Sequence, residues 1–297
     1  MKRYTVDKCP VCNSKNILKV LTASDYLVSH DSFNIMECNE CTLRFNSSIP
    51  NKNDINRYYQ SDNYISHTGV GNTIMNKVYN FVKYFTLRSK KNSVQIFRGN
   101  KTGSILDIGC GTGEFIKIMK QANWEIGGVE DNEFARERTE INVGSTIMDQ
   151  TAFFASTQKY DVITLWHSLE HLYDLKEYLN KISISLNANG VVMIAVPNYQ
   201  SYDAEYFNQD WAAYDVPRHL YHFSFDSLIK LLRQDNFRLI LSRQMPFDPF
   251  YISLLSELSV RRKRNIFKAV AIGVKSYLAG RKDVKNASSI LYVFRKT

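Results

Sequence analysis

The chain has 297 residues, of which 44% are hydrophobic and 23% charged, with a net charge of +9. This composition is ordinary for a soluble globular protein, and the length allows a sizeable core. No apolar run approaches the roughly 18 residues of a transmembrane helix, and the polar residues after Met1 are unlike a signal peptide. These features argue against a membrane-spanning protein, and we expect a cytoplasmic location.

The positive charge is unevenly distributed along the chain. Residues 1–100 carry 14 basic and 7 acidic side chains, residues 101–200 carry 8 and 13, and residues 201–297 carry 16 and 9. Two basic flanks therefore surround an acidic centre. Such flanks favour an anionic partner, which can be a small substrate, a nucleic acid or a lipid surface, or they form a solvated basic face.

Four of the five cysteines lie in the first 50 residues as two C-x-x-C pairs. Cys9 and Cys12 form the first pair, and Cys38 and Cys41 form the second. Two such pairs can hold one zinc ion between four thiolates, a closed structural site with no open position for chemistry. Disulfide bonds and idle thiols are the alternatives. We predict a zinc-ribbon-like module over residues 1–50 that holds one structural Zn²⁺ per chain.

Residues 51–100 read as a polar, aromatic-rich connector that runs into a helix at 73–88. Tyr59, Tyr64 and His67 lie close together in its first part. Tyrosine combines an apolar ring with a polar tip, which suits both a pocket lid and a helix–domain interface. We therefore predict a helical connector or lid, with these three side chains as candidate substrate contacts.

From residue 104 onward, apolar strand patterns alternate with helical ones. The expected strands cover 104–109, 125–130, 145–148, 160–166, 190–196, 237–243 and 289–295, and the expected helices cover 114–122, 132–142, 174–187 and 225–235. This alternation predicts an α/β fold with a doubly wound, mostly parallel sheet over residues 101–297.

A glycine-rich turn, Asp107-Ile-Gly-Cys-Gly-Thr-Gly113, joins the first of these strands to the first helix. Its glycines permit a tight turn and the close approach of a ligand to the backbone. Glu130 ends the next strand, where a carboxylate can accept hydrogen bonds from both hydroxyls of a ribose. A dinucleotide fingerprint would need a third glycine at position 114, which is Glu114. The turn therefore predicts a nucleotide-like ligand other than NAD.

Two further polar groups follow later strands of the predicted sheet. Trp166-His-Ser-Leu-Glu-His171 leaves the strand that ends beside the glycine turn, so His167, Glu170 and His171 should face the ligand. The long connection 198–223 contains the other candidate substrate contacts, which are Asp215, Arg218, His219 and His222. An arginine can bind a phosphate or carboxylate in two places at once, although these charges can also pair with one another.

A long segment, residues 246–287, separates the last two expected strands. Two apolar helical stretches within 252–278 flank the basic run Arg261-Arg-Lys-Arg264. Such a segment can lie on an anionic membrane surface, pack over the fold, or form an interface with a second subunit.

The G-x-G-x-G spacing behind Asp107 resembles motif I of class I S-adenosylmethionine-dependent methyltransferases. Together with the Glu170-His171 pair and Val196-Pro-Asn198, it is similar to the branch that includes ubiquinone-type methyltransferases. The four-cysteine module further resembles that of bacterial deoxysugar C-methyltransferases. The resemblance implies a seven-stranded Rossmann-like sheet with a final antiparallel hairpin, and S-adenosyl-L-methionine as cofactor.

The resemblance also implies roles for individual residues. His171 is the candidate general base, and Glu170 orients it or binds the acceptor. Ser168 stands where the sugar enzymes carry a tyrosine, and ubiquinone-type relatives can hold a divalent ion near this loop. The implied cofactor-binding residues are Asp107, Gly109, Cys110, Gly111, Gly113, Glu130, Asp131, Asp149, Trp166 and His167.

The sequence thus predicts methyl transfer to a small, anionic acceptor such as a nucleotide-linked sugar. Its zinc module and basic flanks leave two alternatives open. One is an RNA methyltransferase, and the other is a protein that binds the cofactor or a nucleic acid without turnover. The oligomeric state cannot be predicted from the sequence.

Overall fold

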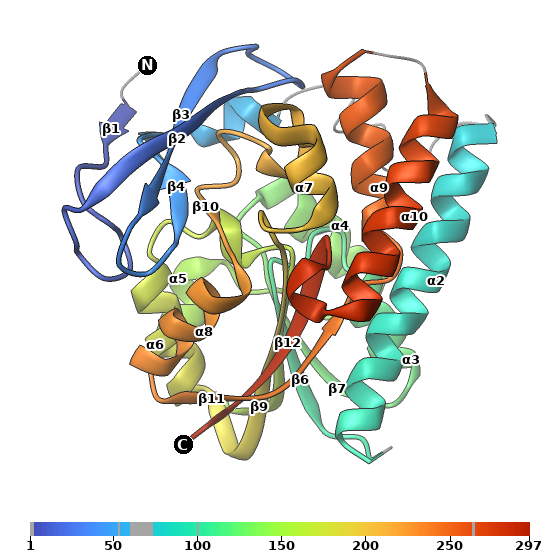
Figure 1. Ribbon diagram of the computed structural model, residues 1–297. Helices are drawn as coiled ribbons and strands as arrows, with labels where there is room; N and C mark the ends of the chain where they lie inside the picture. The colour runs from blue at the N-terminus through green and yellow to red at the C-terminus, as the bar shows by residue number, and fades with distance from the viewer. Residues whose placement is uncertain (1–2, 53, 60–73, 100, 263–264) are drawn as a thin grey trace.

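The computed structural model describes residues 3–52, 54–59, 74–99, 101–262 and 265–297 (Figure 1). A six-stranded sheet with the order β11-β12-β9-β8-β6-β7 forms its centre. The strands are β6 (Ser104–Ile108), β7 (Glu125–Val129), β8 (Tyr160–Trp166), β9 (Leu186–Pro197), β11 (Phe237–Gln244) and β12 (Ser289–Lys296). Strands β7, β6, β8 and β9 run parallel, whereas β12 is antiparallel to both of its neighbours. The expected α/β fold with its closing antiparallel hairpin is confirmed.

The expected seventh strand at 145–148 is reduced to one bridge, between Met148 and Val129. Met148 donates its backbone N–H to the carbonyl of Gly128 at 3.0 Å and accepts the N–H of Glu130 at 2.9 Å, whereas the N–H of Ile147 donates to the side chain of Glu140. Gly144 lies just before this segment in a left-handed conformation that ends the preceding helix. The sheet described here therefore has six strands rather than seven.

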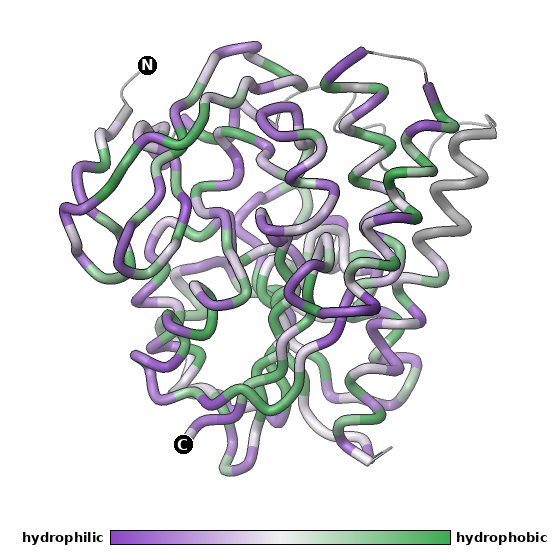
Figure 2. Tube along the Cα trace, viewed as in Figure 1, coloured by the Kyte–Doolittle hydropathy of each residue, from purple (hydrophilic) through white to green (hydrophobic). Residues whose placement is uncertain are grey.

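Both faces of the sheet are buried, which explains the continuous apolar runs of its strands. Val192 and Ile194 of β9 join one apolar core, and Val191 and Met193 join the other. The first core includes α6 (Leu175–Ile184) and α8 (Phe225–Gln234), and the second includes α2 (Ile74–Phe97) and α3 (Glu114–Gln121). Figure 1 shows these pairs of helices on opposite sides of the sheet, and Figure 2 shows the apolar residues gathered along the central strands.

The predicted helices of the domain are present, and two of them start at a side-chain cap. Asn132 caps α4 (Glu133–Val143) by accepting the N–H of Ala135, and Ser224 forms a capping box at α8. A short helix, α5 (Gln150–Ala155), was not expected and is capped by Asp149. The helix α6 ends earlier than predicted because β9 already begins at Leu186.

The N-terminal module is a second, smaller β-structure. Its strands are β1 (Arg3–Thr5), β2 (Ile17–Ser24), β3 (Ser32–Cys38), β4 (Arg44–Asn46) and β5 (Ser48–Pro50), and the short helix η1 (Ile55–Tyr59) follows. β2, β3 and β4 form a sheet whose fourth strand, β10 (Tyr221–His222), comes from the connection after β9. The module boundary expected at residue 50 stays a prediction. The sheet of the module also contains β10, which lies far beyond residue 50 in the sequence.

The segment 246–287 folds over the molecule. It contains α9 (Asp248–Leu255), the π-helical turn η5 (Ser256–Val260), α10 (Ile266–Lys282) and η6 (Val284–Asn286). A Cβ atom on Gly273 would lie 3.0 Å from the Cα of Phe250, so glycine permits the close packing of α10 on α9. Ile252 and Ile272 are buried in the core beside α7 (Tyr202–Phe207). Among the described residues, no helix is long and apolar enough to cross a membrane.

Candidate functional site

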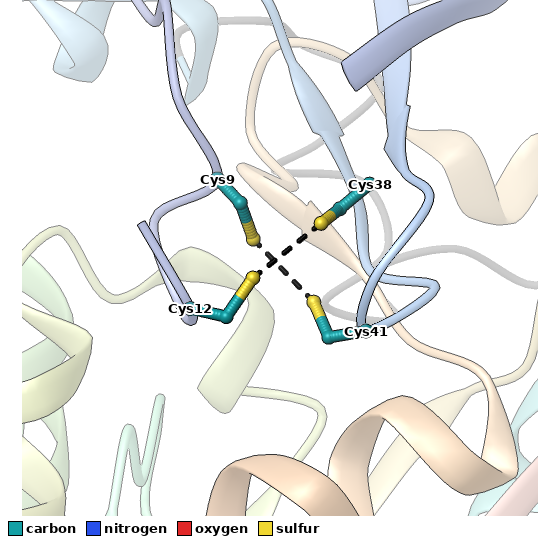
Figure 3. Close-up of side chains that lie close together, drawn as sticks. All are labelled: Cys9, Cys12, Cys38 and Cys41. Carbon is teal, nitrogen blue, oxygen red and sulfur yellow. Dashed lines mark hydrogen bonds between the residues drawn. The ribbon is translucent and has the colours of Figure 1, made fainter. Parts of the chain in front are cut away.

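The four paired cysteines converge in the module. Figure 3 shows their side chains pointing toward one centre, with Cys9 facing Cys41 and Cys12 facing Cys38. Both of these Sγ–Sγ distances are 3.4 Å, and all four sulfur atoms lie within 4.8 Å of one another. Zn–S bonds of about 2.3 Å in a tetrahedron require sulfur atoms roughly 3.8 Å apart. The arrangement is too long for disulfide bonds and fits a zinc ion in a closed four-thiolate site.

The glycine turn has the backbone that its sequence predicts. Gly109, Gly111 and Gly113 all have positive φ angles, of 74°, 56° and 80°. A Cβ atom on Gly109 would lie 2.5 Å from the Cβ of Ser168, so only glycine lets the turn pack against the segment after β8. Space next to Gly111 is open, which leaves its backbone accessible to a ligand.

Glu130 is joined to this turn. Its carboxylate accepts the backbone N–H groups of Gly111 and Asn132 at 2.8 and 3.0 Å. Asp131 and Asp149, also predicted to contact the cofactor, accept backbone N–H groups at the start of α5. The three carboxylates therefore lie together beyond the ends of β6 and β7, where an adenosine moiety would need hydrogen-bond acceptors.

Asp107 and Cys110 are buried residues of the glycine turn. Burial raises the pKa of Asp107 to about 7, and the hydroxyl of Thr164 donates to its carboxylate at 2.6 Å. Cys110 is buried among apolar side chains, and burial raises the pKa of its thiol. Cys110 therefore contributes packing to the turn rather than a nucleophile.

A cavity of about 990 Å³ begins beside the glycine turn and ends under the 198–223 connection. Thr112 and Glu114 line its cofactor end, and Asp215 and His219 line the other. Other lining residues that carry polar groups include Tyr26, Lys90, His167 and Asp248. The cavity is thus lined by the domain of the central sheet, by the inserted segment and by the N-terminal module.

His167 lines the cavity and has a positive φ angle of 57°. Its Nε2 lies 3.0 Å from Oδ2 of Asp248, and its Nδ1 lies 3.7 Å from Oε1 of Glu170. Burial opposes a charge on the ring, but these two carboxylates outweigh it and raise the pKa of His167 to about 9. The imidazole is therefore protonated at neutral pH and cannot accept a proton from a substrate.

Glu170, His171 and His219 form a compact cluster whose ligand atoms lie within 4.8 Å of one another. The rings of His171 and His219 meet edge to face at a centroid distance of 4.6 Å. Both carboxylate oxygens of Glu170 are buried without a hydrogen-bond partner among the described residues. The imidazoles on either side of Glu170 hold its pKa below the usual value against the effect of burial.

The two histidines of the cluster both use Nδ1 for a hydrogen bond to a backbone carbonyl, but they differ in their access to the cavity. Nδ1 of His171 donates to the carbonyl oxygen of Arg218 at 3.0 Å, while burial and His219 lower the pKa of His171 to about 4. Nδ1 of His219 donates to the carbonyl oxygen of Ala213 at 2.8 Å, and its Nε2 lies 3.9 Å from Glu170 and 4.0 Å from Asp215. His219 lines the cavity, and His171 is not among the residues that do.

Arg218, predicted to bind an anionic acceptor, is fully buried instead. Its Nε donates to both oxygens of Asp215 at 3.0 Å, and its Nη2 donates to Asp25 at 2.9 Å. Nη1 donates to the carbonyl oxygen of Tyr58. The guanidinium therefore links the 198–223 connection to the N-terminal module and does not line the cavity.

The remaining predicted contacts are dispersed. His222 is buried next to Asn46, and Trp166 packs edge to face on Phe115. The hydroxyl of Tyr59 lies 3.1 Å from Nδ1 of His171. The predicted contacts Tyr64 and His67 lie outside the described residues.

Lys90, Asp248 and Tyr26 are among the cavity residues that sequence reasoning missed, and they come from outside the motifs. Lys90 of α2 lies with its Nζ 5.0 Å from the ring centroid of Trp166, and burial lowers its pKa against the attraction of Asp107 and Asp248. Asp248 is the first residue of α9, and Tyr26 belongs to the β2–β3 turn. None of the three belongs to a motif or to a spacing pattern in the sequence.

The raised pKa of His167 predicts a pH-dependent contribution to stability. The unfolded pKa is about 6.5, so the ion pairs stabilise the fold fully below that pH and are lost as the pH rises through about 9. His167→Gln should therefore lower the free energy of unfolding by about 1–3 kcal/mol at about pH 6 and by much less at about pH 10. Urea titrations at both pH values measure this difference. The exposed His30→Gln should show none, and an effect of His167→Gln that grows with pH would contradict the assignment.

Comparisons with known proteins agree with this geometry. The family model described as "Methyltransferase domain" matches residues 83–242. The chain is 30% identical over 108 residues to the ubiquinone biosynthesis O-methyltransferase of Actinobacillus pleuropneumoniae serotype 5b (strain L20). That match covers 32% of this chain and 45% of the relative, so the chain spans about half the length of this curated protein.

Two solved structures share the fold. A methyltransferase from Thermotoga maritima has a TM-score of 0.51 at 16% identity, over 79% of this chain and 99% of the other. The magnesium protoporphyrin IX methyltransferase of Synechocystis PCC 6803, solved with S-adenosylhomocysteine, has a TM-score of 0.55 at 13% identity, over 83% and 100%. The expected Rossmann-like methyltransferase fold is confirmed. Because the family model spans more than half of the sequence, this chain belongs to the methyltransferase-domain family, in its S-adenosylmethionine-dependent class.

Proposed function

We propose that the protein transfers a methyl group from S-adenosylmethionine to a small molecule bound in the cavity beside His219. The observation that carries this proposal is the single cavity that joins the glycine turn to the Asp215–His219 segment. Its lining by residues of the N-terminal module and of α9, in addition to those of the central domain, supports a small acceptor over a strand of RNA. The dense set of ionisable groups at its centre supports catalysis over binding without turnover.

The residues around the glycine turn suit the cofactor. Glu130 can accept the ribose hydroxyls once Gly111 and Asn132 share its carboxylate with a ligand, and open space beside Gly111 leaves room for one. Lys90 supplies a cation at the same end of the cavity, where it can bind a carboxylate, and Asp107 supplies a buried acceptor beneath the turn. When bound, the cofactor supplies an activated methyl group on a sulfonium.

The protein's main contribution is then to position the acceptor, which can be worth roughly 7–11 kcal/mol. An acceptor that must lose a proton also needs a base. Within the cluster we assign this role to His219 rather than to His171, the candidate from the sequence. His219 lines the cavity, its Nδ1 is fixed by a carbonyl, and its Nε2 has two carboxylates about 4 Å away to stabilise the imidazolium. His171 then holds the ring of His219 in place.

Calorimetry with S-adenosylhomocysteine tests the cofactor assignment directly. We expect micromolar-range binding by the native chain and none of NAD. Glu130→Ala should weaken this binding by about 1.5–3 kcal/mol, the usual worth of hydrogen bonds to a charged group. Glu133→Ala, which removes an exposed carboxylate one turn away, serves as the control and should change nothing. Preferential binding of NAD, or unchanged affinity in Glu130→Ala, would contradict the proposal.

A further inference from the structure

The turn between β2 and β3 of the N-terminal module reaches the cavity of the methyltransferase domain. Tyr26 and Leu27 of this turn both line the cavity, together with Asp215 and His219. Burial raises the pKa of Tyr26 far above its usual value, so its phenol is neutral. A part of the chain that lies outside the methyltransferase family match therefore forms a wall next to the reacting groups.

Asp25 fixes the conformation of this turn. Its fully buried carboxylate accepts the backbone N–H groups of Leu27 at 3.1 Å, Val28 at 3.3 Å and Ser29 at 2.7 Å, as well as the hydroxyl of Ser29. An aspartate that caps its own turn in this way removes the conformational freedom of the residues that follow. Tyr26 and Leu27 are therefore presented to the cavity by a rigid loop.

The carboxylate of Asp25 also joins this turn to the 198–223 connection. Asp25 accepts a hydrogen bond from Arg218, and neither side chain is exposed. Arg218 in turn holds Asp215, which lines the cavity. A second connection lies close by, because the side-chain amide of Asn46 donates to the carbonyl oxygen of His219 at 2.8 Å. The module thus positions both Asp215 and the proposed base.

The other walls at this end of the cavity are apolar. Ala212 and Ala213 come from the 198–223 connection, and Tyr251, Ile252 and Leu255 come from α9. With Tyr26 and Leu27, they surround the acceptor side with aromatic and aliphatic carbon. Such a surface binds a ligand by excluding water from an apolar body, and a few polar groups fix its orientation.

We propose that the turn of residues 25–27 is the acceptor-recognition element of this enzyme, and that it selects an acceptor whose body is uncharged and aromatic or aliphatic. This inference rests on the proposed methyl transfer in the same cavity. It gives the four-cysteine module a role in substrate choice in addition to its structural one.

The charges around the acceptor side disfavour an anion. The three guanidinium nitrogens of Arg218 already donate to Asp25, Asp215 and the backbone of Tyr58, so they are not available to a phosphate. His167 is held between Asp248 and Glu170. An anionic group on the acceptor side would lie near the carboxylates of Asp215 and Asp248. The cations that could balance its charge, on Arg218 and His167, are already in ion pairs. The sequence-based expectation of an anionic acceptor, drawn from the basic flanks, is replaced by this one.

Two fluorinated probes of matched shape test the proposal on the full chain saturated with S-adenosylhomocysteine. 4-Fluorobenzyl alcohol presents a neutral aromatic body, and 4-fluorobenzoate presents the same ring with a negative charge. Fluorine NMR line broadening measures the binding of each. We expect the alcohol to bind at least 10-fold more tightly than the benzoate. Tyr26→Ala should weaken binding of the alcohol at least 5-fold, and Tyr26→Phe, which keeps the ring, should restore most of it.

Leu18→Ala is the matched control, because Leu18 is an exposed residue of β2 in the same module and should leave binding unchanged. Equal or tighter binding of the benzoate would overturn the proposal, as would no binding of the alcohol or an unchanged affinity in Tyr26→Ala. Circular dichroism establishes that each variant is folded. Calorimetry with S-adenosylhomocysteine separates the two proposals, since a native chain that does not bind it contradicts the methyltransferase function itself.

Discussion

His219→Asn is expected to lower turnover by roughly 10²–10⁴, the usual contribution of general acid–base catalysis. The substitution keeps a side chain of similar shape but cannot accept the proton of an acceptor. Cofactor affinity should stay within about 0.5 kcal/mol, because the glycine turn and Glu130 are remote from the substitution. Formation of S-adenosylhomocysteine with an acceptor found by screening gives the rate, and calorimetry gives the affinity.

His171→Asn is the comparison that makes this result informative. His171 lies against His219 and outside the cavity lining, so its loss should disturb the position of the base without removing it. We expect a smaller decrease in turnover than for His219→Asn. If turnover survives in His219→Asn and collapses in His171→Asn, the roles are reversed, and the assignment made from the sequence is the better one.

Cys38→Ser is expected to remove the metal and to unfold the N-terminal module. Elemental analysis of native protein purified without added metal should give about one zinc per chain, and the variant should give far less. Binding of zinc to a four-cysteine site is worth about 10–16 kcal/mol in small zinc-finger peptides, which exceeds what such a module can gain from its core alone. Hydrogen exchange should show loss of protection across β2, β3 and β4.

The structure adds a consequence for the same variant. Because β10 pairs with β4 and Arg218 pairs with Asp25, protection should also fall in residues 211–222, while β6 and α3 keep theirs. Cys110→Ser is the control for a lost thiol outside the cluster and should retain the metal. An intact native chain without metal, or a Cys38→Ser variant that retains zinc and full protection, would contradict the zinc site.

The sheet and the cofactor turn could be predicted because their signals are local. A tight turn requires glycines, which stand at 109, 111 and 113, and a ribose site at a strand end requires an acceptor such as Glu130. Alternating apolar runs specify the order of strands and helices. The exception is the seventh strand at 145–148, of which only Met148 pairs with β7. The apolar pattern of these residues does not show that the pairing is limited to one residue.

The acceptor side could not be predicted because it is assembled from distant segments. Arg218 has the sequence context of a ligand-binding residue, yet its guanidinium forms a buried ion pair with Asp25, nearly 200 positions earlier in the sequence. Asp248 and Lys90 reach the cavity only because α9 and α2 fold over it. The choice between His171 and His219 as proton acceptor depends on which ring nitrogen donates a hydrogen bond to a backbone carbonyl. Those hydrogen bonds form only in the tertiary structure.

The pairing of β4 with β10 has a consequence for synthesis on the ribosome. The four cysteines emerge together within the first 41 residues, so the metal cluster can close early, but the strand that completes its sheet is made about 180 residues later. The central sheet waits longer still, since β12, which is translated after β9 and β11, inserts between them. Until then, two open strand edges are exposed to other nascent chains. Slow elongation through 245–288 would lengthen this vulnerable period and favour aggregation.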